Sequence, residues 1–203
     1  MNEKSLPEFL AALASKDPVP GGGGASALIG ALGASLCSMV ANLTSGKPKY
    51  AEYQADIEKI LSLAAASSTR LLELIEEDAK GFEPLAAAYA IPKDNPDRAE
   101  ILEAALAEAC AAPLGIVKEA ANVAGLAEAL LSKGSKLAVS DVGVAATACR
   151  AAMEGAAMNI FINTKLLKNR DHAAKLNEQA KAALEEGVDK CEAIYKKITS
   201  ELT

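Results

Sequence analysis

A glycine run directly precedes an uncharged apolar segment, and this pair limits the possible fold more than any other feature of the sequence. The run reads Pro18-Val19-Pro20-Gly21-Gly22-Gly23-Gly24, and residues 25–43 contain no charged side chain. Glycine lets the backbone turn sharply and lets a ligand come close, while a helix that starts there leaves several N–H groups unpaired. Such a corner suits an anionic or polar ligand. The alternative is a flexible turn between two helices.

Small apolar residues dominate the composition. Apolar residues make up 51% of the 203 residues but aromatic residues only 3%, with no Trp. Alanine favours helices, and small side chains allow close packing of helix axes. The sequence has neither an alternating strand pattern nor an internal repeat. We therefore predict an all-α, single-domain bundle of about six helices that spans residues 1–203.

The charge balance and the cysteines limit the class of partner. The formal net charge is −6 without any basic cluster, which argues against nucleic acid and anionic membranes as partners. Residues 25–43 are long enough to span a membrane, but Ala, Gly and Ser dominate them and no second span follows. No secretion signal is evident, and the four cysteines are widely dispersed. We expect a cytoplasmic protein with reduced thiols and a small-molecule or protein partner.

Residues 50–90 carry the periodicity of one long helix with a buried face. Its apolar stripe, in steps of three and four, consists of Ile57, Leu61, Ala64, Ser68, Leu71, Ile75, Asp78, Phe82, Leu85 and Tyr89. Asp78 is the one charged residue on this stripe. A carboxyl group flanked by apolar residues is driven toward its neutral form and can then donate a proton near neutral pH. The alternative is a buried Asp that pairs with a lysine or caps another helix.

The sequence offers no evident residue set for metal-dependent catalysis or for a serine or cysteine nucleophile. The only histidine, His172, lies in a polar stretch, so no transition-metal ligand set is expected and no serine or cysteine has an evident base. Asn159 and Asn163 are spaced four apart on one helix face, where they either bind a polar ring or bond across the bundle. Lys47 and Lys49 are either solvated or contact an anionic ligand tail.

Proline, small residues and helix-capping residues predict several further local structures. Residues 27–38 include a face of small side chains that favours tight helix packing, a dimer seam or a ligand wall. The helix from Asp97 meets Pro113, where it should kink or restart. Residues 137–139 suggest a brief extended segment, after which Ser140 and Asp141 cap a helix that runs to about residue 168.

Taken together, these motifs resemble the cyclodeaminase/cyclohydrolase family of folate enzymes, and the resemblance covers nearly the whole chain. The matching segments are Pro18-Val19-Pro20-Gly21-Gly22-Gly23, Thr44-Ser45-Gly46-Lys47, Asp78 with Phe82, Ile91-Pro92-Lys93, Ser140-Asp141, and Asn159 with Asn163.

The resemblance implies an all-helical homodimer, or a higher homo-oligomer, that acts on the one-carbon unit between N5 and N10 of tetrahydrofolate without metal or cofactor. By this analogy Asp78 is the proton donor that both reactions of the family need. Gly24 and the run from Asn42 to Tyr50 look closer to the stand-alone bacterial cyclohydrolases. Methenyltetrahydrofolate cyclohydrolase activity is therefore expected first and formiminotetrahydrofolate cyclodeaminase activity second. A non-enzymatic helical scaffold is the third alternative.

The resemblance also implies roles for the substrate-binding residues. The glycine loop would hold the pterin or the one-carbon region, the two lysines would meet the glutamate tail, and the two asparagines would bond the pterin edge. The expected substrate-binding residues are Pro20, Gly21, Gly22, Gly23, Gly24, Thr44, Lys47, Lys49, Ser140, Asp141, Asn159 and Asn163.

Overall fold

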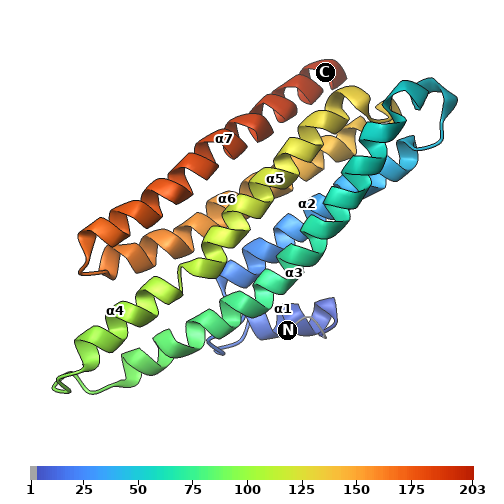
Figure 1. Ribbon diagram of the computed structural model, residues 1–203. Helices are drawn as coiled ribbons and strands as arrows, with labels where there is room; N and C mark the ends of the chain where they lie inside the picture. Colours follow the sequence, from blue (N-terminus) through green and yellow to red (C-terminus); the bar gives the residue numbers. More distant parts are fainter. Residues whose placement is uncertain (1–3) are drawn as a thin grey trace.

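The computed structural model describes residues 4–203, which form seven α-helices and two short 3-10 helices (Figure 1). In chain order these are α1 (Leu6–Leu13), α2 (Gly22–Thr44), η1 (Pro48–Tyr53), α3 (Gln54–Ala90), α4 (Arg98–Glu108), α5 (Ala111–Lys133), η2 (Lys136–Ala138), α6 (Val139–Leu166) and α7 (Arg170–Leu202). No strand occurs within this described part of the chain. The predicted all-α bundle is confirmed.

The long helices α2, α3, α5 and α6 pack around one core, and α7 covers α5 and α6 (Figure 1). Small side chains let these helices approach closely. A Cβ added to Gly33 of α2 would lie 3.0 Å from Sγ of Cys149 and 3.2 Å from the carbonyl oxygen of Ala145, both on α6. The buried residues of the predicted small-residue face, Ala27, Ala31 and Ala34, pack inside one chain, which confirms the interpretation as tight helix packing for this part of residues 27–38.

Helix α3 carries Asp78 and bears out most of the predicted stripe. Ile57, Leu71, Ile75 and Leu85 are buried, and the helix continues through Pro84 to Ala90. Its C-terminal part packs with α4 on a second, smaller apolar cluster. Tyr89 lies beyond this contact and is 46% exposed, so its predicted burial is wrong.

Two predicted local structures need correction near the start of α6. Residues 137–139 are not extended, because a hydrogen bond from the Ala138 N–H to the Ser135 carbonyl closes a 3-10 turn there. Helix α6 then begins at Val139, so Ser140 and Asp141 lie in its first turn rather than at its cap.

The helix predicted from residue 97 ends at Glu108 and a new helix begins at Ala111, which confirms the predicted restart. Pro113 therefore lies in the first turn of α5, where proline is tolerated.

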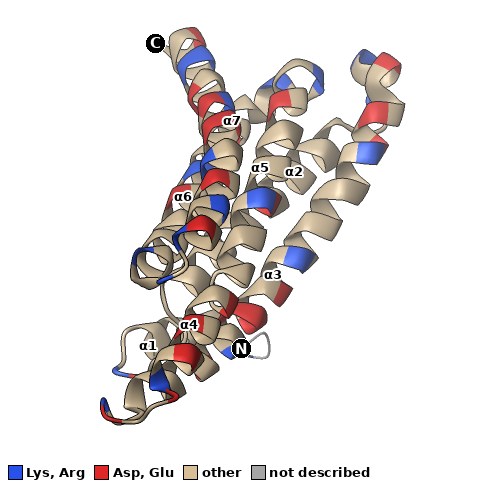
Figure 2. Ribbon diagram, turned by 60° about the vertical axis from the view of Figure 1, so that its left-hand side comes forward, with Lys and Arg blue, Asp and Glu red and all other residues tan. Residues whose placement is uncertain are grey.

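Charged side chains are unevenly distributed over the helices. Figure 2 shows Lys, Arg, Asp and Glu along α7 and α3, whereas α2 carries none. Within the described residues α2 is the one helix long and apolar enough to cross a membrane. Its most apolar 18-residue window has a mean hydropathy of 1.7, and 56% of that window is buried inside the protein.

The four cysteines, Cys37, Cys110, Cys149 and Cys191, are all free and buried, as predicted for small apolar packing residues.

Candidate active site

The carboxyl group of Asp78 lies against the first turn of α2. A Cβ added to Gly23 would overlap this carboxyl group, with Cγ and Oδ2 each 2.5 Å away. The backbone N–H of Gly24 donates a hydrogen bond to the same group. The missing side chain at position 23 is therefore what lets an acid from α3 reach the N-terminus of α2.

Two opposing effects act on the protonation of Asp78. Burial raises the pKa of this carboxyl group above its ordinary value, and the hydrogen bond from the Gly24 N–H lowers it by a smaller amount. The net shift is upward, so the neutral acid persists to a higher pH than it would in water. This confirms that the carboxyl group of Asp78 points inward and is driven toward its neutral form, as the sequence predicts.

Two amide side chains from α6 face the same corner. Nδ2 of Asn159 donates to the carbonyl of Gly155 at 3.0 Å, and it lies 3.4 Å from the position that a Cβ on Gly22 would take. The side chain of Asn163, one turn further, is hydrogen-bonded to the buried thiol of Cys110. The predicted pair therefore does share one face, with Asn159 beside the glycine loop.

These groups line a cavity of about 140 Å³. Its walls are Pro18, Val19, Gly21, Gly22, Gly23, Asp78, Phe82, Ala109, Pro113, Asn159, Ile162 and Asn163. Asp78 is the one titratable side chain among these lining residues. Pockets that enclose a drug-sized ligand measure about 300–1,000 Å³, so this cavity is large enough for only part of a ligand of that size.

Sequence reasoning missed part of this wall. Ala109 and Pro113 enter it because α4 ends and α5 begins there, and Pro113 had signalled only a helix break. Ile162 lies three residues after Asn159, so helical periodicity could have indicated it. Pro20 and Gly24, both predicted to bind substrate, do not line the cavity. The N–H of Gly24 instead donates a hydrogen bond to Asp78. A Cβ added to Gly24 would lie 3.4 Å from the Cβ of Pro20.

The remaining predicted residues lie at the other end of the bundle. Thr44 is separated from Gly22 by 22 helical residues, which is about 33 Å along α2. Asp141 precedes Asn159 by 18 residues, about 27 Å along α6. Lys47 and Lys49 follow Thr44 and are exposed. Within a single chain, Thr44, Lys47, Lys49 and Asp141 therefore lie too far from Asp78 to contact the same ligand, and the prediction that they do so is wrong for one chain.

Thr44 has a structural role at that end. Its hydroxyl donates to the Val40 carbonyl at 2.7 Å and accepts from the Ser135 N–H at 2.8 Å, and the residue is fully buried. It ties the end of α2 to the turn before η2. Nearby, the hydroxyl of Tyr50 accepts a hydrogen bond from the Lys136 N–H at 3.0 Å, which lowers the pKa of Tyr50. Lys49 lies 5.6 Å from the centre of the Tyr50 ring.

Similar proteins place these features in a family. The model of the formiminotransferase-cyclodeaminase family matches residues 5–182. A methenyltetrahydrofolate cyclohydrolase of Methylorubrum extorquens is 36% identical over 203 residues, which cover 98% of each chain. A formimidoyltransferase-cyclodeaminase of Sus scrofa is 30% identical over 187 residues, but the match spans only 35% of that longer protein.

A solved structure agrees with the sequence comparisons. The crystal structure of formiminotetrahydrofolate cyclodeaminase from Thermotoga maritima superimposes with a TM-score of 0.85 at 28% identity. The match covers 97% of this chain and 98% of that chain, so the helical arrangement is shared from end to end. The chain belongs to the formiminotransferase-cyclodeaminase family.

Proposed function

We propose that this chain is a methenyltetrahydrofolate cyclohydrolase, which converts 5,10-methenyltetrahydrofolate to 10-formyltetrahydrofolate in the cytoplasm. The observation that carries this proposal is the half-buried carboxyl group of Asp78 against the first turn of α2, in a cavity that opens to a larger ligand. The full-length similarity to a cyclohydrolase supports it. The alternative activity, formiminotetrahydrofolate cyclodeaminase, is supported by the matched Thermotoga maritima structure.

In the proposed reaction Asp78 is the one side chain that accepts and donates a proton. Water attacks the cationic methenyl carbon, and the carboxylate of Asp78 accepts the proton that the water loses. The carbon then bears a hydroxyl group and two nitrogens. Cleavage of the bond to N5 forms the formyl carbonyl: Asp78 returns its proton to N5, and the hydroxyl proton leaves to solvent. One proton is released overall, and the raised pKa of Asp78 suits a group that both accepts and donates.

The other cavity residues would orient the substrate. The N–H groups of Gly22 and Gly23 belong to the first turn of α2 and have no acceptor within the helix, so they can face developing negative charge on oxygen. The amides of Asn159 and Asn163 would bond the pterin edge. The reaction as written uses carboxyl, amide and backbone groups and needs no metal or cofactor.

The glutamate tail requires groups outside this cavity, because no cation lines it. The lysines at positions 47 and 49 would serve only if they came from a second chain, since about 33 Å of helix separates Gly22 from Thr44. We therefore include a homodimer in the proposal, with the partner's Lys47 and the partner's Lys49 near the tail of a substrate held at Asp78.

A comparative assay tests the proposed activity. Purified protein is given methenyltetrahydrofolate, whose absorbance is followed, and in parallel formiminotetrahydrofolate, whose ammonia release is measured. Faster turnover of the first substrate supports the cyclohydrolase, and faster release of ammonia supports the cyclodeaminase. Absence of both activities, with no folate binding by calorimetry, would leave the non-enzymatic scaffold.

A further inference from the structure

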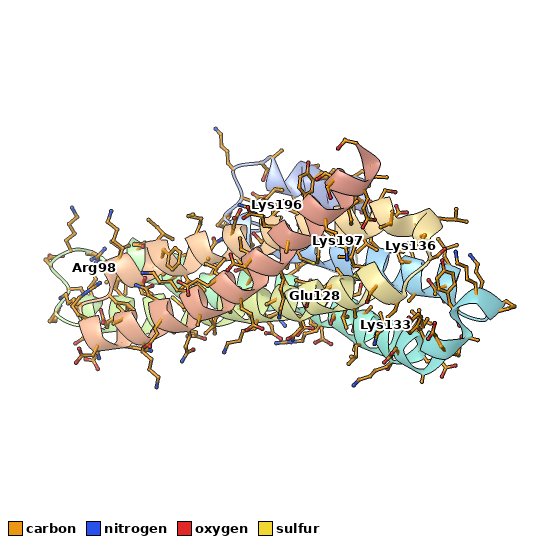
Figure 3. The ribbon with its side chains drawn as sticks, turned by 90° about the horizontal axis from the view of Figure 1, so that it is seen from above. Arg98, Glu128, Lys133, Lys136, Lys196 and Lys197 are labelled. Atoms are coloured by element: carbon orange, nitrogen blue, oxygen red, sulfur yellow. The ribbon has the colours of Figure 1, made fainter. Side chains whose placement is uncertain are left out.

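Cys110 occupies the turn between α4 and α5, beside the cavity. Figure 1 shows these two helices following one another along the bundle, and Figure 3 shows Arg98, at the start of α4, near one end of the molecule and Lys133, at the end of α5, toward the other. The neighbouring Ala109 lines the cavity, whereas the side chain of Cys110 is fully buried behind it. A group in this position can act on the cavity wall without touching a ligand.

The thiol of Cys110 uses its single proton within the protein. It donates to the Leu106 carbonyl, with 3.3 Å between sulfur and oxygen, and the Ile160 carbonyl lies 4.0 Å from the same sulfur. The side chain of Asn163 is also hydrogen-bonded to this thiol. Because the thiol proton is directed at carbonyl oxygens, the sulfur can only accept from Asn163, and the amide N–H is the donor.

The pKa of Cys110 agrees with this direction. Burial raises the pKa of the thiol to about 11, and the hydrogen bond with Asn163 opposes this rise. A hydrogen bond lowers the pKa of an acid when it is donated to the charged form, which here is the thiolate. The nitrogen of the Asn163 amide therefore faces Cys110, and its oxygen faces away.

A different contact holds Asn159 in the same sense. Its Nδ2 donates to the Gly155 carbonyl at 3.0 Å. Turning this amide over would place its oxygen against that carbonyl oxygen, and turning Asn163 over would place its oxygen against the lone pairs of sulfur. In both cases an acceptor would face an acceptor. Each amide is thus fixed with its nitrogen toward the protein.

The two amide oxygens are left for a ligand. Asn159 and Asn163 both line the cavity, and within residues 4–203 neither amide oxygen receives a hydrogen bond. No fully buried side-chain oxygen or nitrogen in this part of the chain lacks a partner, so both oxygens reach open space. The α6 wall of the cavity therefore presents two hydrogen-bond acceptors that are one helical turn apart.

We propose that Cys110 is a positioning residue for Asn163, and that the wall formed by Asn159 and Asn163 binds a ligand edge with two neighbouring N–H donors. A ring carbonyl at this edge would meet the amide oxygens as a further acceptor and would be rejected. The identity of the edge rests on the proposed function. In a pterin, N3–H and the 2-amino group are adjacent donors, whereas O4 is an acceptor, so the pterin turns its 2-amino edge toward α6.

Substitution of Cys110 tests the positioning role in the reaction. Cys110→Ala removes the acceptor of the Asn163 amide and should raise KM roughly five- to tenfold, the scale of one hydrogen bond, while kcat stays within about twofold. Cys110→Ser keeps both a proton and an acceptor and should restore the wild-type KM. Cys191→Ala removes another buried free thiol, on α7, and is the matched control with both constants unchanged. An unchanged KM in Cys110→Ala, or a Cys110→Ser variant no better than Cys110→Ala, would overturn the role.

Nuclear magnetic resonance of the side-chain amides tests the contact without folate. The signal of Asn163 is identified as the one that disappears in Asn163→Asp. Its N–H protons should exchange with water roughly tenfold faster in Cys110→Ala than in the wild type. Cys110→Ser and Cys191→Ala should exchange at the wild-type rate, and a thermal melt checks that each variant is folded. Equal exchange rates in Cys110→Ala and the wild type would contradict the proposal.

Calorimetry with two ligands tests which edge is bound. Tetrahydrofolate is compared with an analogue that carries a methyl group in place of the 2-amino group. The wild type should bind the analogue roughly tenfold or more weakly, because one donor is lost, and Asn163→Leu should discriminate less between the two. Equal affinities in the wild type would overturn the assigned edge. Failure of both ligands to bind would overturn the proposed function and the pterin assignment, whereas the exchange rates would still decide whether Cys110 positions Asn163.

Discussion

The carboxyl group of Asp78 occupies the space where a side chain on Gly23 would be, and both residues line the cavity. The acid comes from the middle of α3 and the glycine from the first turn of α2. Because the contact is this close, the position of this carboxyl group depends on the absence of a methyl group at position 23.

Gly23→Ala is expected to abolish most activity by pushing Asp78 out of place. Its Cβ would overlap the carboxyl group, so turnover should fall roughly a hundredfold, the usual scale for losing a positioned acid or base. Gly125→Ala on α5 is the control, because its Cβ would meet no atom within 4 Å. Steady-state kinetics of both variants check this. Equal turnover in the two would show that the contact with Gly23 does not position the acid.

Asp78→Asn should keep the fold and the affinity for folate but lower turnover roughly a hundredfold or more. The amide has the same shape and cannot deliver a proton. Calorimetry with folate and a thermal melt provide the binding and folding controls, and Glu83→Gln, an exposed acid on the same helix, should be fully active. Full activity of Asp78→Asn would remove this residue from the mechanism.

The stability difference between Asp78→Asn and the wild type should depend on pH. The folded pKa of Asp78 is raised above its ordinary value of 3.8, so the folded state binds this proton more tightly than the unfolded state does. That contribution is complete below pH 3.8 and is lost as the pH rises through the raised folded pKa. The melting temperature of Asp78→Asn should therefore rise relative to that of the wild type as the pH increases from 3.8 through the raised folded pKa. A difference in melting temperature that stays constant with pH would contradict the raised pKa.

Lys47→Ala combined with Lys49→Ala should weaken polyglutamylated substrate more than the monoglutamate form, with the difference fading at high salt. Equal loss for both forms would count against a tail site. A mixing experiment then assigns the chain of origin. If the lysines act across the dimer, randomly mixed Asp78→Asn chains and lysine-variant chains should regain about a quarter of wild-type activity, since half the dimers then hold one intact site. No recovery on mixing would place the lysines elsewhere.

Thr44→Val should cost about 1–3 kcal/mol in the free energy of unfolding, because it leaves the buried N–H of Ser135 without its acceptor. Thr69→Val is the control. Its exposed hydroxyl also bonds a helical carbonyl, but its loss should cost no more than about 0.5 kcal/mol. Urea unfolding measures both. A normal stability with a raised KM would restore Thr44 to the substrate site instead.

Local sequence patterns were sufficient for most of the individual helices and for the burial of Asp78. The stripe from Ile57 to Leu85 reports which face of α3 is buried, and an acid on that stripe is therefore recognisable before any fold is known. The glycine run likewise indicates a helix start that a ligand or an acidic side chain can approach closely. Residues 137–141 were harder, because a short extended segment and a 3-10 turn share the same sequence signals and differ only in a hydrogen bond from Ala138 to Ser135.

The sequence by itself determined an all-helical chain, an inward acid and a glycine-rich helix start, since each depends on neighbours within a few turns. Only the tertiary structure decided which of these residues meet. Gly23, Asp78 and Asn159 come from three helices and converge because α2 packs between α3 and α6. Thr44, Lys47 and Asp141 belong to the same helices or their ends, yet lie tens of ångströms away, because a helix rises by about 1.5 Å per residue. Periodicity tells which side of a helix a residue faces; the packing of the helices decides which residues share a site.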